Sequence, residues 1–262
     1  MAVRALKKFG QHFLEPAWAD KLIAAIDPKP DDRFLEIGPG PGALTLRLAP
    51  RVDHVIAVEI DAAMIEALHQ RVPPNVTLIH EDFLELEPST LGDQPLRVAG
   101  NLPYNVSSPI LFKLLDMARP RGILTDATLM LQREVADRIT AAPGGGEYGV
   151  LAILTQWRAD VRRVLALPPG AFRPAPRIHS AVVTLRFRPP AVTVGDETAF
   201  REMVRSIFTL RRKTLANSLK PYAARRGKDA AAALLAAQID PRRRPETLQL
   251  AELARLADVL VL

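Results

Sequence analysis

The chain has 262 residues, 48% hydrophobic and 24% charged, which is enough for one large α/β domain and a smaller second domain. Its net charge of +6 favours an anionic partner, and nucleic acid is the first candidate. It has no cysteine, which excludes disulfides, thiolate metal sites and a cysteine nucleophile.

No stretch of the sequence has the apolar run of a signal peptide, or the roughly 20 apolar residues of a membrane span. The five histidines are scattered without the spacing of metal ligands, so we expect no metal site. These features together predict a cytoplasmic protein, expected to be a monomer, that has neither a membrane nor a metal among its partners.

The N-terminal segment is basic. Arg4, Lys7 and Lys8 fit an arm that lies on RNA phosphates, or else a solvated tail. Apolar residues at helical spacing predict a helix over residues 15–26, and the prolines that begin at Pro28 end it.

A glycine-rich turn follows the first predicted strand, at residues 33–37, and precedes a predicted helix at 43–48. The turn reads Gly38-Pro39-Gly40-Pro41-Gly42. Glycines let a backbone approach a ligand closely, and a helix N-terminus offers free N–H groups. The next strand ends at Glu59, about 20 residues beyond the first glycine, where a dinucleotide fold places the acid that binds ribose. This pairing predicts a nucleoside cofactor.

The glycine spacing is GxGxG rather than GxGxxG, and Glu36 stands inside the preceding strand. A carboxylate there repels a pyrophosphate but tolerates a sulfonium or an ammonium group, which favours S-adenosylmethionine over NAD. Alternatively, Glu36 satisfies N–H groups of the loop, which is compatible with either cofactor.

The third and fourth predicted strands, at 76–79 and 96–99, also lead to polar groups. Asp82 can accept a hydrogen bond from an adenine amine with Phe83 packed nearby, or it caps a short helical turn. Four consecutive strands thus deliver Gly38, Glu59, Asp82 and Asn101. In an open α/β sheet this is the edge at which ligands bind.

The turn after the fourth strand carries Asn101, Leu102, Pro103 and Tyr104. The proline frees the neighbouring backbone carbonyls from a regular ladder. The Asn101 side-chain oxygen and the Leu102 carbonyl can then accept hydrogen bonds from a planar amine while the Tyr104 ring stacks on its carrier. The alternative is a strand-to-helix turn whose Asn caps the helix and whose Tyr packs.

The chain then continues with helices and strands, and a proline-rich stretch at 168–176 interrupts them. Because proline fixes that stretch at low entropic cost, we expect Phe172 to be a stacking partner of Tyr104. The remaining elements are predicted helices at 109–117, 132–141 and 148–157, and predicted strands at 126–131, 161–165 and 180–187.

Pro189 and Pro190 mark a linker that divides a first domain, 1–188, from a helical second domain, 189–262. Residues 201–262 carry thirteen Lys and Arg against six Asp and Glu, with little aromatic character. We expect this domain to dock on structured RNA through backbone and shape. We expect Arg211, Arg212 and Lys213 to contact the RNA phosphates.

Five motifs in this order resemble the KsgA-type ribosomal RNA adenine dimethyltransferases, and the resemblance runs from Arg4 to the C-terminus. The motifs are Phe9-Gly10-Gln11-His12-Phe13-Leu14, Glu36-Ile37-Gly38-Pro39-Gly40-Pro41-Gly42, Glu81-Asp82-Phe83-Leu84, Asn101-Leu102-Pro103-Tyr104-Asn105 and Phe172-Arg173-Pro174-Ala175-Pro176. The first and fourth are highly specific together, whereas most class I methyltransferases share the glycine turn.

The resemblance implies an α/β fold: a Rossmann-like class I methyltransferase domain with a mostly parallel sheet and an antiparallel last strand, followed by a small all-α domain. It implies S-adenosylmethionine as cofactor and pre-subunit rRNA as partner. The implied reaction dimethylates the exocyclic amines of two adjacent adenosines near the 3′ end of small-subunit rRNA during subunit biogenesis. The expected cofactor-binding positions are Gln11, His12, Leu14, Gly38, Gly40, Glu59, Ile60, Asp82, Phe83 and Asn101, and the expected catalytic positions are Asn101, Leu102, Pro103, Tyr104 and Phe172.

Three other functions are compatible with parts of the sequence. A non-catalytic assembly factor would show a degraded catalytic turn, and the turn from Asn101 to Tyr104 is intact. An NAD-dependent oxidoreductase is disfavoured by the glycine spacing and by the lack of a proton-transfer residue near the turn. The erythromycin-resistance methyltransferases share the fold with an Asn-Ile-Pro-Tyr turn, and Leu102 favours the KsgA type.

Overall fold

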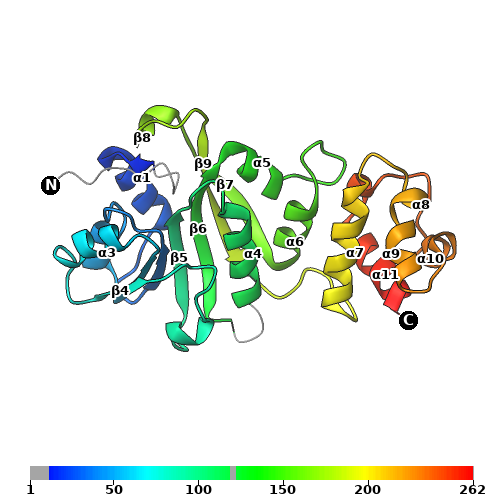
Figure 1. Cartoon of the computed structure of the whole chain (residues 1–262), viewed down its shortest axis with the longest axis horizontal. Helices are drawn as coiled ribbons and strands as arrows, with labels where there is room; N and C mark the ends of the chain where they lie inside the picture. Colours follow the sequence, from blue (N-terminus) through cyan, green and yellow to red (C-terminus); the bar gives the residue numbers. More distant parts are fainter. Residues whose placement is uncertain (1–11, 119–121, 262) are drawn as a thin grey trace. The chain divides into compact units, whose positions relative to one another are not determined.

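The computed structural model describes residues 12–118 and 122–261 (Figure 1). They form two compact units. The first holds the described residues up to Ala136 together with Asp160–Arg188, and the second holds Asp137–Ala159 together with the described residues from Pro189 onward. Arg4, Lys7, Lys8 and Gln11 lie outside the described residues.

The C-terminal helices begin a separate unit after Arg188, and residues 137–159 pack with those helices rather than with the sheet. The physical reason lies in the helix that ends this segment. Trp157 is fully buried, its ring lies 4.8 Å from that of Phe200, and its indole N–H donates to the Val192 carbonyl. Arg158 is paired with Glu197 in the same unit.

A seven-stranded sheet organises the described part of the first unit, in the order β4-β3-β2-β5-β6-β9-β7. Strands β2 to β6 are parallel where they pair, and β9 runs antiparallel to β6. The strands are β2 (Arg33–Ile37), β3 (His54–Glu59), β4 (Val76–His80), β5 (Leu96–Asn101), β6 (Leu124–Gln132), β7 (Ala159–Leu167) and β9 (Ser180–Phe187). Both β2 and β3 are buried almost along their whole length, as parallel strands covered on two faces are.

The order of the strands reverses beside β2. The chain passes from β2 outward to β3 and β4, and then returns to β5 on the other side of β2. Because these strands are parallel, their carboxyl ends share one edge, and ligands of open α/β sheets bind at such a reversal. The helices of this unit are α1 (Pro16–Ile26), α2 (Thr45–Leu48), α3 (Ala62–His69), α4 (Ser107–Met117) and the first residues of α5 (Arg133–Ile139).

A small second sheet holds Phe13 and Leu14 against the proline-rich stretch. Strand β1 (Phe13–Leu14) pairs antiparallel with β8 (Phe172–Arg173), so that Leu14 lies opposite Phe172. Both side chains belong to an apolar core that also contains residues of α1 and β2. This pairing fixes His12 beside the carboxyl edge of the main sheet. Short 3₁₀ turns lie at Ala49–Arg51, Pro88–Leu91, Pro169–Ala171 and Pro245–Thr247.

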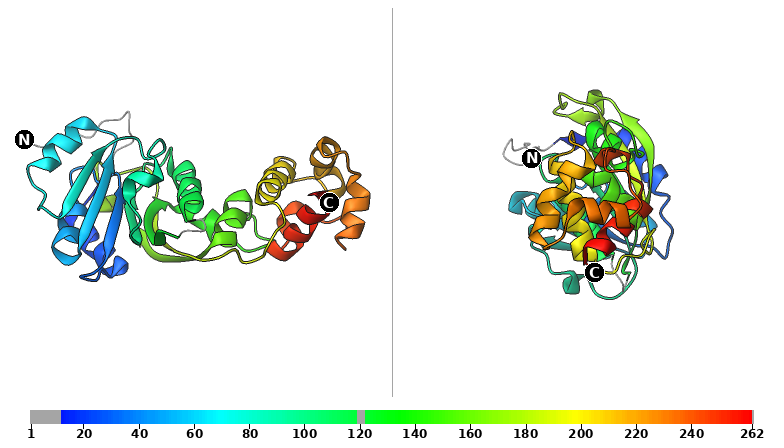
Figure 2. Two further views of the ribbon diagram at one scale, coloured as in Figure 1. Left: turned by 90° about the horizontal axis from the view of Figure 1, so that it is seen from below. Right: turned by 90° about the vertical axis from the view of Figure 1, so that its right-hand side faces the viewer.

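The second unit is helical, and Figure 2 shows its helices packed around one another. Helix α7 has one strongly apolar face, from which Phe200, Met203 and Ile207 are fully buried. No helix among residues 12–118 and 122–261 is both long and apolar enough to cross a membrane. The helices are α6 (Val150–Arg158), α7 (Glu197–Thr209), α8 (Leu215–Ser218), α9 (Lys220–Arg225), α10 (Ala230–Ala236) and α11 (Leu250–Val261).

Candidate active site

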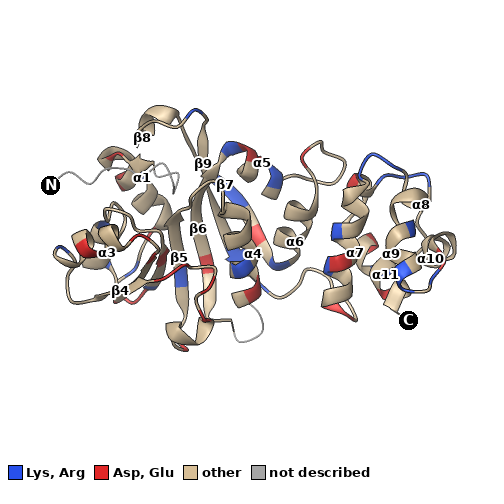
Figure 3. Cartoon of the chain, viewed as in Figure 1, with Lys and Arg blue, Asp and Glu red and all other residues tan. Residues whose placement is uncertain are grey.

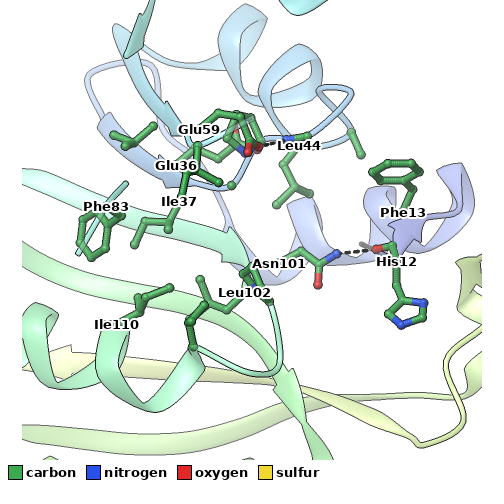
Figure 4. A pocket seen from close by; sticks show the side chains of 18 of the residues that line it. His12, Phe13, Glu36, Ile37, Leu44, Glu59, Phe83, Asn101, Leu102 and Ile110 are labelled. Carbon is green, nitrogen blue, oxygen red and sulfur yellow. Dashed lines mark hydrogen bonds between the residues drawn. The ribbon is translucent and has the colours of Figure 1, made fainter. Parts of the chain in front are cut away.

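A cavity of about 270 Å³ opens at the carboxyl ends of β2, β3, β4 and β5. Figure 4 shows its lining side chains converging from these strand ends and from the segment before β1. The predicted positions that line it are His12, Leu14, Gly38, Gly40, Glu59, Ile60, Asp82, Phe83, Asn101, Leu102, Pro103 and Tyr104. The sequence motifs, up to 92 residues apart, therefore form one site.

The glycine turn follows β2 and passes along the cavity. Gly38 and Gly40 have φ angles of +68° and +53°, which L side chains rarely adopt. A Cβ atom on Gly40 would also lie 3.6 Å from the Phe13 ring. The backbone N–H of Gly40 donates to Glu59 Oε2 at 2.9 Å, so the turn and the end of β3 are joined.

Glu59 ends β3 and is 6% exposed. Its second oxygen, Oε1, accepts from the backbone N–H of Asp61 at 3.0 Å. Burial raises the pKa of this carboxyl above its usual value, and the two backbone N–H groups oppose that shift. Each carboxylate oxygen keeps lone pairs for ligand hydroxyls, since a carboxylate has about four acceptor sites.

Glu36 lies in the middle of the site, on β2, and is 1% exposed. Its Oε2 has no hydrogen-bond partner among the described residues. Burial raises its pKa to about 7, and the nearby Glu59 carboxylate adds to the shift. A buried acidic oxygen without a donor favours a cationic ligand group beside it. A hydrogen bond from the Thr45 backbone, just beyond the glycine turn, opposes this rise of the pKa. It is compatible with the alternative in which Glu36 satisfies N–H groups of the loop.

The end of β4 supplies Asp82 and Phe83. Asp82 Oδ1 accepts from the backbone N–H of Leu84 at 2.9 Å, so this residue both stabilises a turn and lines the cavity. Phe83 is buried, and the Lys113 ammonium lies 5.4 Å from its ring centre. Ile60 is the most exposed apolar side chain of the lining, at 46%.

Asn101 ends β5 and turns its side chain toward the segment before β1 (Figure 4). Its Nδ2 donates to the backbone carbonyl of His12 at 2.9 Å. The Leu102 side chain is buried, and its backbone N–H donates to the Met130 carbonyl at 3.2 Å. Within the described part of the chain, neither Asn101 Oδ1 nor the Leu102 carbonyl oxygen accepts a hydrogen bond. Two acceptors therefore stand open beside the cavity.

Tyr104 is held on two sides. Its hydroxyl lies 2.6 Å from Ser180 Oγ, and its ring stacks on that of His12 with centroids 5.7 Å apart and planes inclined by 27°. The Nδ1 of His12 donates to the carbonyl of Pro174 at 2.7 Å, because a carbonyl can only accept. Burial raises the pKa of the Tyr104 phenol.

The expected stacking pair of Tyr104 and Phe172 is not what the structure shows. Phe172 is fully buried in the apolar core and does not line the cavity. Pairing with β1 turns its side chain into that core, a long-range effect that the local proline pattern does not reveal. His12 occupies the position against Tyr104 instead.

The C-terminal cations expected to contact RNA lie in the second unit, in the connection after α7 (Figure 3). Hydrogen bonds from Leu215 N–H to the Arg243 carbonyl and from Ala216 N–H to the Pro241 carbonyl join this connection to a second basic one. We call the two connections together the basic surface; its residues are Arg211, Arg212, Lys213, Arg242, Arg243 and Arg244.

Not all of these cations are equally available. Arg211 donates to the Gly146 carbonyl, Arg242 pairs with Asp240, and Arg243 pairs with Glu252. The side chains of Arg212, Lys213 and Arg244 form no hydrogen bond or ion pair within residues 12–118 and 122–261. Arg212 and Lys213 were expected as contacts from the sequence. Arg244 lies in the second connection, which the fold brings next to the first.

The fold and the site together define a Rossmann-like class I methyltransferase. A crystal structure of a dimethyladenosine transferase from Plasmodium falciparum has a TM-score of 0.76 and 27% identity, covering 94% of this chain and 96% of that one. A crystal structure of the 23S rRNA methyltransferase ErmE has a TM-score of 0.65 and 27% identity, covering 95% of this chain and 100% of that one.

Sequence comparison identifies the family within the class I methyltransferases. The family model described as ribosomal RNA adenine dimethylase matches residues 3–260. Ribosomal RNA small subunit methyltransferase A of Geobacter metallireducens is 42% identical over 99% of this chain and 96% of its own length. The protein of the same name from Pseudomonas fluorescens is 43% identical over 98% of this chain and 94% of its own length. The chain therefore belongs to the ribosomal RNA adenine dimethylase family.

Proposed function

We propose that this protein dimethylates the exocyclic amines of two adjacent adenosines near the 3′ end of small-subunit rRNA, during assembly of the subunit. Its membership of the ribosomal RNA adenine dimethylase family supports the reaction class. The observation that carries the proposal in the structure is the pair of open acceptors, Asn101 Oδ1 and the Leu102 carbonyl, at the rim of a nucleoside-sized cavity.

S-adenosylmethionine fits the donors and acceptors that line this cavity, and it supplies a methyl group already activated on a sulfonium. The unpartnered Glu36 oxygen suits a cationic group, since it is buried without a donor. Glu59, with backbone-anchored oxygens, suits the ribose hydroxyls, and Asp82 suits the adenine amine. The glycine turn lets the backbone come close to the cofactor, because Gly38 and Gly40 carry no side chain.

The chemical task of the protein is to position the acceptor amine. An exocyclic adenine amine is a poor nucleophile because its lone pair is delocalised into the ring. Asn101 Oδ1 and the Leu102 carbonyl oxygen accept hydrogen bonds from the two N–H groups of this amine and favour a pyramidal nitrogen that faces the methyl group. Positioning for in-line attack then contributes most of the acceleration, and no general base is needed before transfer.

The target base has to leave its stack before it reaches these acceptors, at a cost of a few kcal/mol. A side-chain ring recovers about 1–3 kcal/mol when a base stacks on it. Tyr104 lines the cavity and is the ring available for this contact, because Phe172 is buried.

The basic surface of the second unit contributes affinity for the subunit. Arg212, Lys213 and Arg244 are exposed and have no carboxylate partner among the described residues, so RNA phosphates can pair with them without breaking an internal ion pair. The scarcity of aromatic residues there favours contact with backbone and shape rather than with bases.

The proposal is tested by incubating the protein with methyl-labelled S-adenosylmethionine and small subunits that lack the modification, followed by mapping of the labelled nucleosides. We expect dimethyladenosine at two adjacent positions near the 3′ end of the rRNA, and no incorporation into subunits that already carry it. Tight binding of subunits without any incorporation would instead identify a non-catalytic assembly factor. Label on another base or in large-subunit rRNA would refute the assigned substrate.

A further inference from the structure

Ser180, the first residue of β9, lies next to the candidate active site without lining its cavity. Its side chain is 1% exposed, and its Oγ lies 2.6 Å from the Tyr104 hydroxyl. An O–H···O hydrogen bond of this length is at the short end of the usual distribution. The contact joins residues 76 positions apart in the sequence.

The two partners belong to structural elements of different kinds. Tyr104 stands in the turn between β5 and α4, a turn closed by a hydrogen bond from Val106 N–H to the Pro103 carbonyl. Ser180 belongs to a strand that is paired residue by residue with β6, where it faces Gln132. The hydroxyl contact therefore ties a turn side chain to the main sheet.

The segment before Ser180 also restrains the face of the Tyr104 ring. Pro174 accepts the hydrogen bond of His12 Nδ1, and the His12 ring stacks on Tyr104. One connection, from β8 to β9, thus fixes the phenol at its oxygen through Ser180 and at one ring face through His12. A side chain whose rotamer is held by such contacts is preorganised for binding.

The phenol keeps its proton under ordinary conditions. Burial raises the pKa of Tyr104, so at neutral pH the group is a neutral hydroxyl that can either donate to Ser180 Oγ or accept from it. If the Ser180 hydroxyl is removed, a half-buried phenol oxygen loses its partner, and only the stack on His12 still restrains the ring.

We propose that Ser180 is a positioning residue for methyl transfer, whose hydroxyl holds the Tyr104 ring in the orientation that stacks on the incoming adenine. The inference rests on the proposed function, and it assigns Ser180 a role in the rate of transfer rather than in cofactor binding. Misplacement of a reacting group by 1 Å can cost roughly a hundredfold in rate, so we expect about a tenfold loss when only this tether is removed.

A double-mutant cycle tests the proposal. Ser180→Ala and Tyr104→Phe each remove one partner of the same hydrogen bond, and the double variant removes both. We expect each single variant and the double variant to lower single-turnover methylation of subunits by the same factor, about tenfold, with unchanged affinity for S-adenosylmethionine. Ser180→Thr, which keeps a hydroxyl, is expected to restore most of the rate. The proposal is overturned if the double variant loses rate by the product of the two single factors, or if Ser180→Ala methylates at the wild-type rate.

A second measurement does not depend on activity. The chain has only three tyrosines, so the ring signal of Tyr104 in a ¹³C-tyrosine-labelled sample is assigned by its loss in Tyr104→Phe. Ser180→Ala is expected to shift the Tyr104 signal and leave those of Tyr148 and Tyr222 in place. An unmoved Tyr104 signal in Ser180→Ala contradicts the tether. If Ser180→Ala shifts the signal but the wild-type protein methylates no subunit, the failure lies in the proposed function.

Discussion

The side-chain amide of Asn101 donates its hydrogen bond to the backbone carbonyl of His12 across 2.9 Å. Because the donor nitrogen is used in this way, the amide orientation is fixed and Oδ1 remains as the acceptor. His12 therefore does more than line the cavity, since its carbonyl sets which end of the Asn101 amide faces a substrate. The β1–β8 pairing of Phe13 and Leu14, the two residues after His12, holds this segment in place.

Glu59 is expected to dominate the ribose contact. Glu59→Ala removes a carboxylate that is anchored by Gly40 and Asp61, and the loss of a hydrogen bond to a charged group costs about 1.5–3 kcal/mol. We expect the Kd for S-adenosylmethionine, measured by calorimetry, to rise at least about tenfold. Glu66→Ala, at an exposed position of α3, serves as the control. An unchanged Kd in a folded Glu59→Ala protein would rule out this role.

Glu36 is expected to make stability depend on pH. Its pKa is raised from 4.5 to about 7 in the folded protein, so the native state holds its proton where the unfolded state has lost it. The corresponding stabilisation is complete below pH 4.5 and is lost as the pH rises through about 7. The shift corresponds to roughly 3 kcal/mol.

Glu36→Gln removes this titration while keeping the shape of the side chain. We expect the free energy of unfolding, from urea titrations at pH 5 and pH 8, to fall less with rising pH in this variant than in the wild type. Glu66→Gln, at an exposed position, is expected to keep the wild-type pH dependence. Equal slopes for Glu36→Gln and the wild type would mean that Glu36 has an ordinary pKa.

The basic surface is expected to govern the salt dependence of subunit binding. Arg212→Glu with Lys213→Glu removes two unpaired cations, so binding should weaken and its dependence on salt should flatten by roughly one unit of slope per lost phosphate contact. Lys220→Glu with Lys228→Glu makes the same change of charge elsewhere in the second unit, at two exposed positions. The docking role is wrong if both pairs of substitutions have the same effect.

Much of the site follows from the sequence because it depends on local order. Gly38, Glu59, Asp82 and Asn101 lie at or just beyond the carboxyl ends of four strands, and parallel strands bring such positions to one edge. The antiparallel strand β9 and the helical tail were also expected, and the comparisons confirm the class of fold.

What the sequence did not reveal depends on pairing between distant segments. The rigid proline stretch suggested a presented Phe172, but β1 pairs with β8 and buries it. Ser180 looked like the start of an alternating strand, and nothing near it in the sequence points to Tyr104. Likewise, residues 137–159 join the second unit because Trp157 packs on Phe200, which lies beyond the linker.

The most direct measurement compares Asn101→Ala with the wild type in single-turnover methylation of unmethylated small subunits, alongside the Kd for S-adenosylmethionine. Removing the amide deletes one of the two acceptors for the adenine amine and leaves the Glu36, Glu59 and Asp82 side chains of the cavity in place. We expect transfer to fall by at least about a hundredfold, as when a preorganised hydrogen-bonding group at a reacting centre is removed, while the Kd changes only a few-fold. Dimethylation by Asn101→Ala at a near-wild-type rate would contradict the proposed role of this residue.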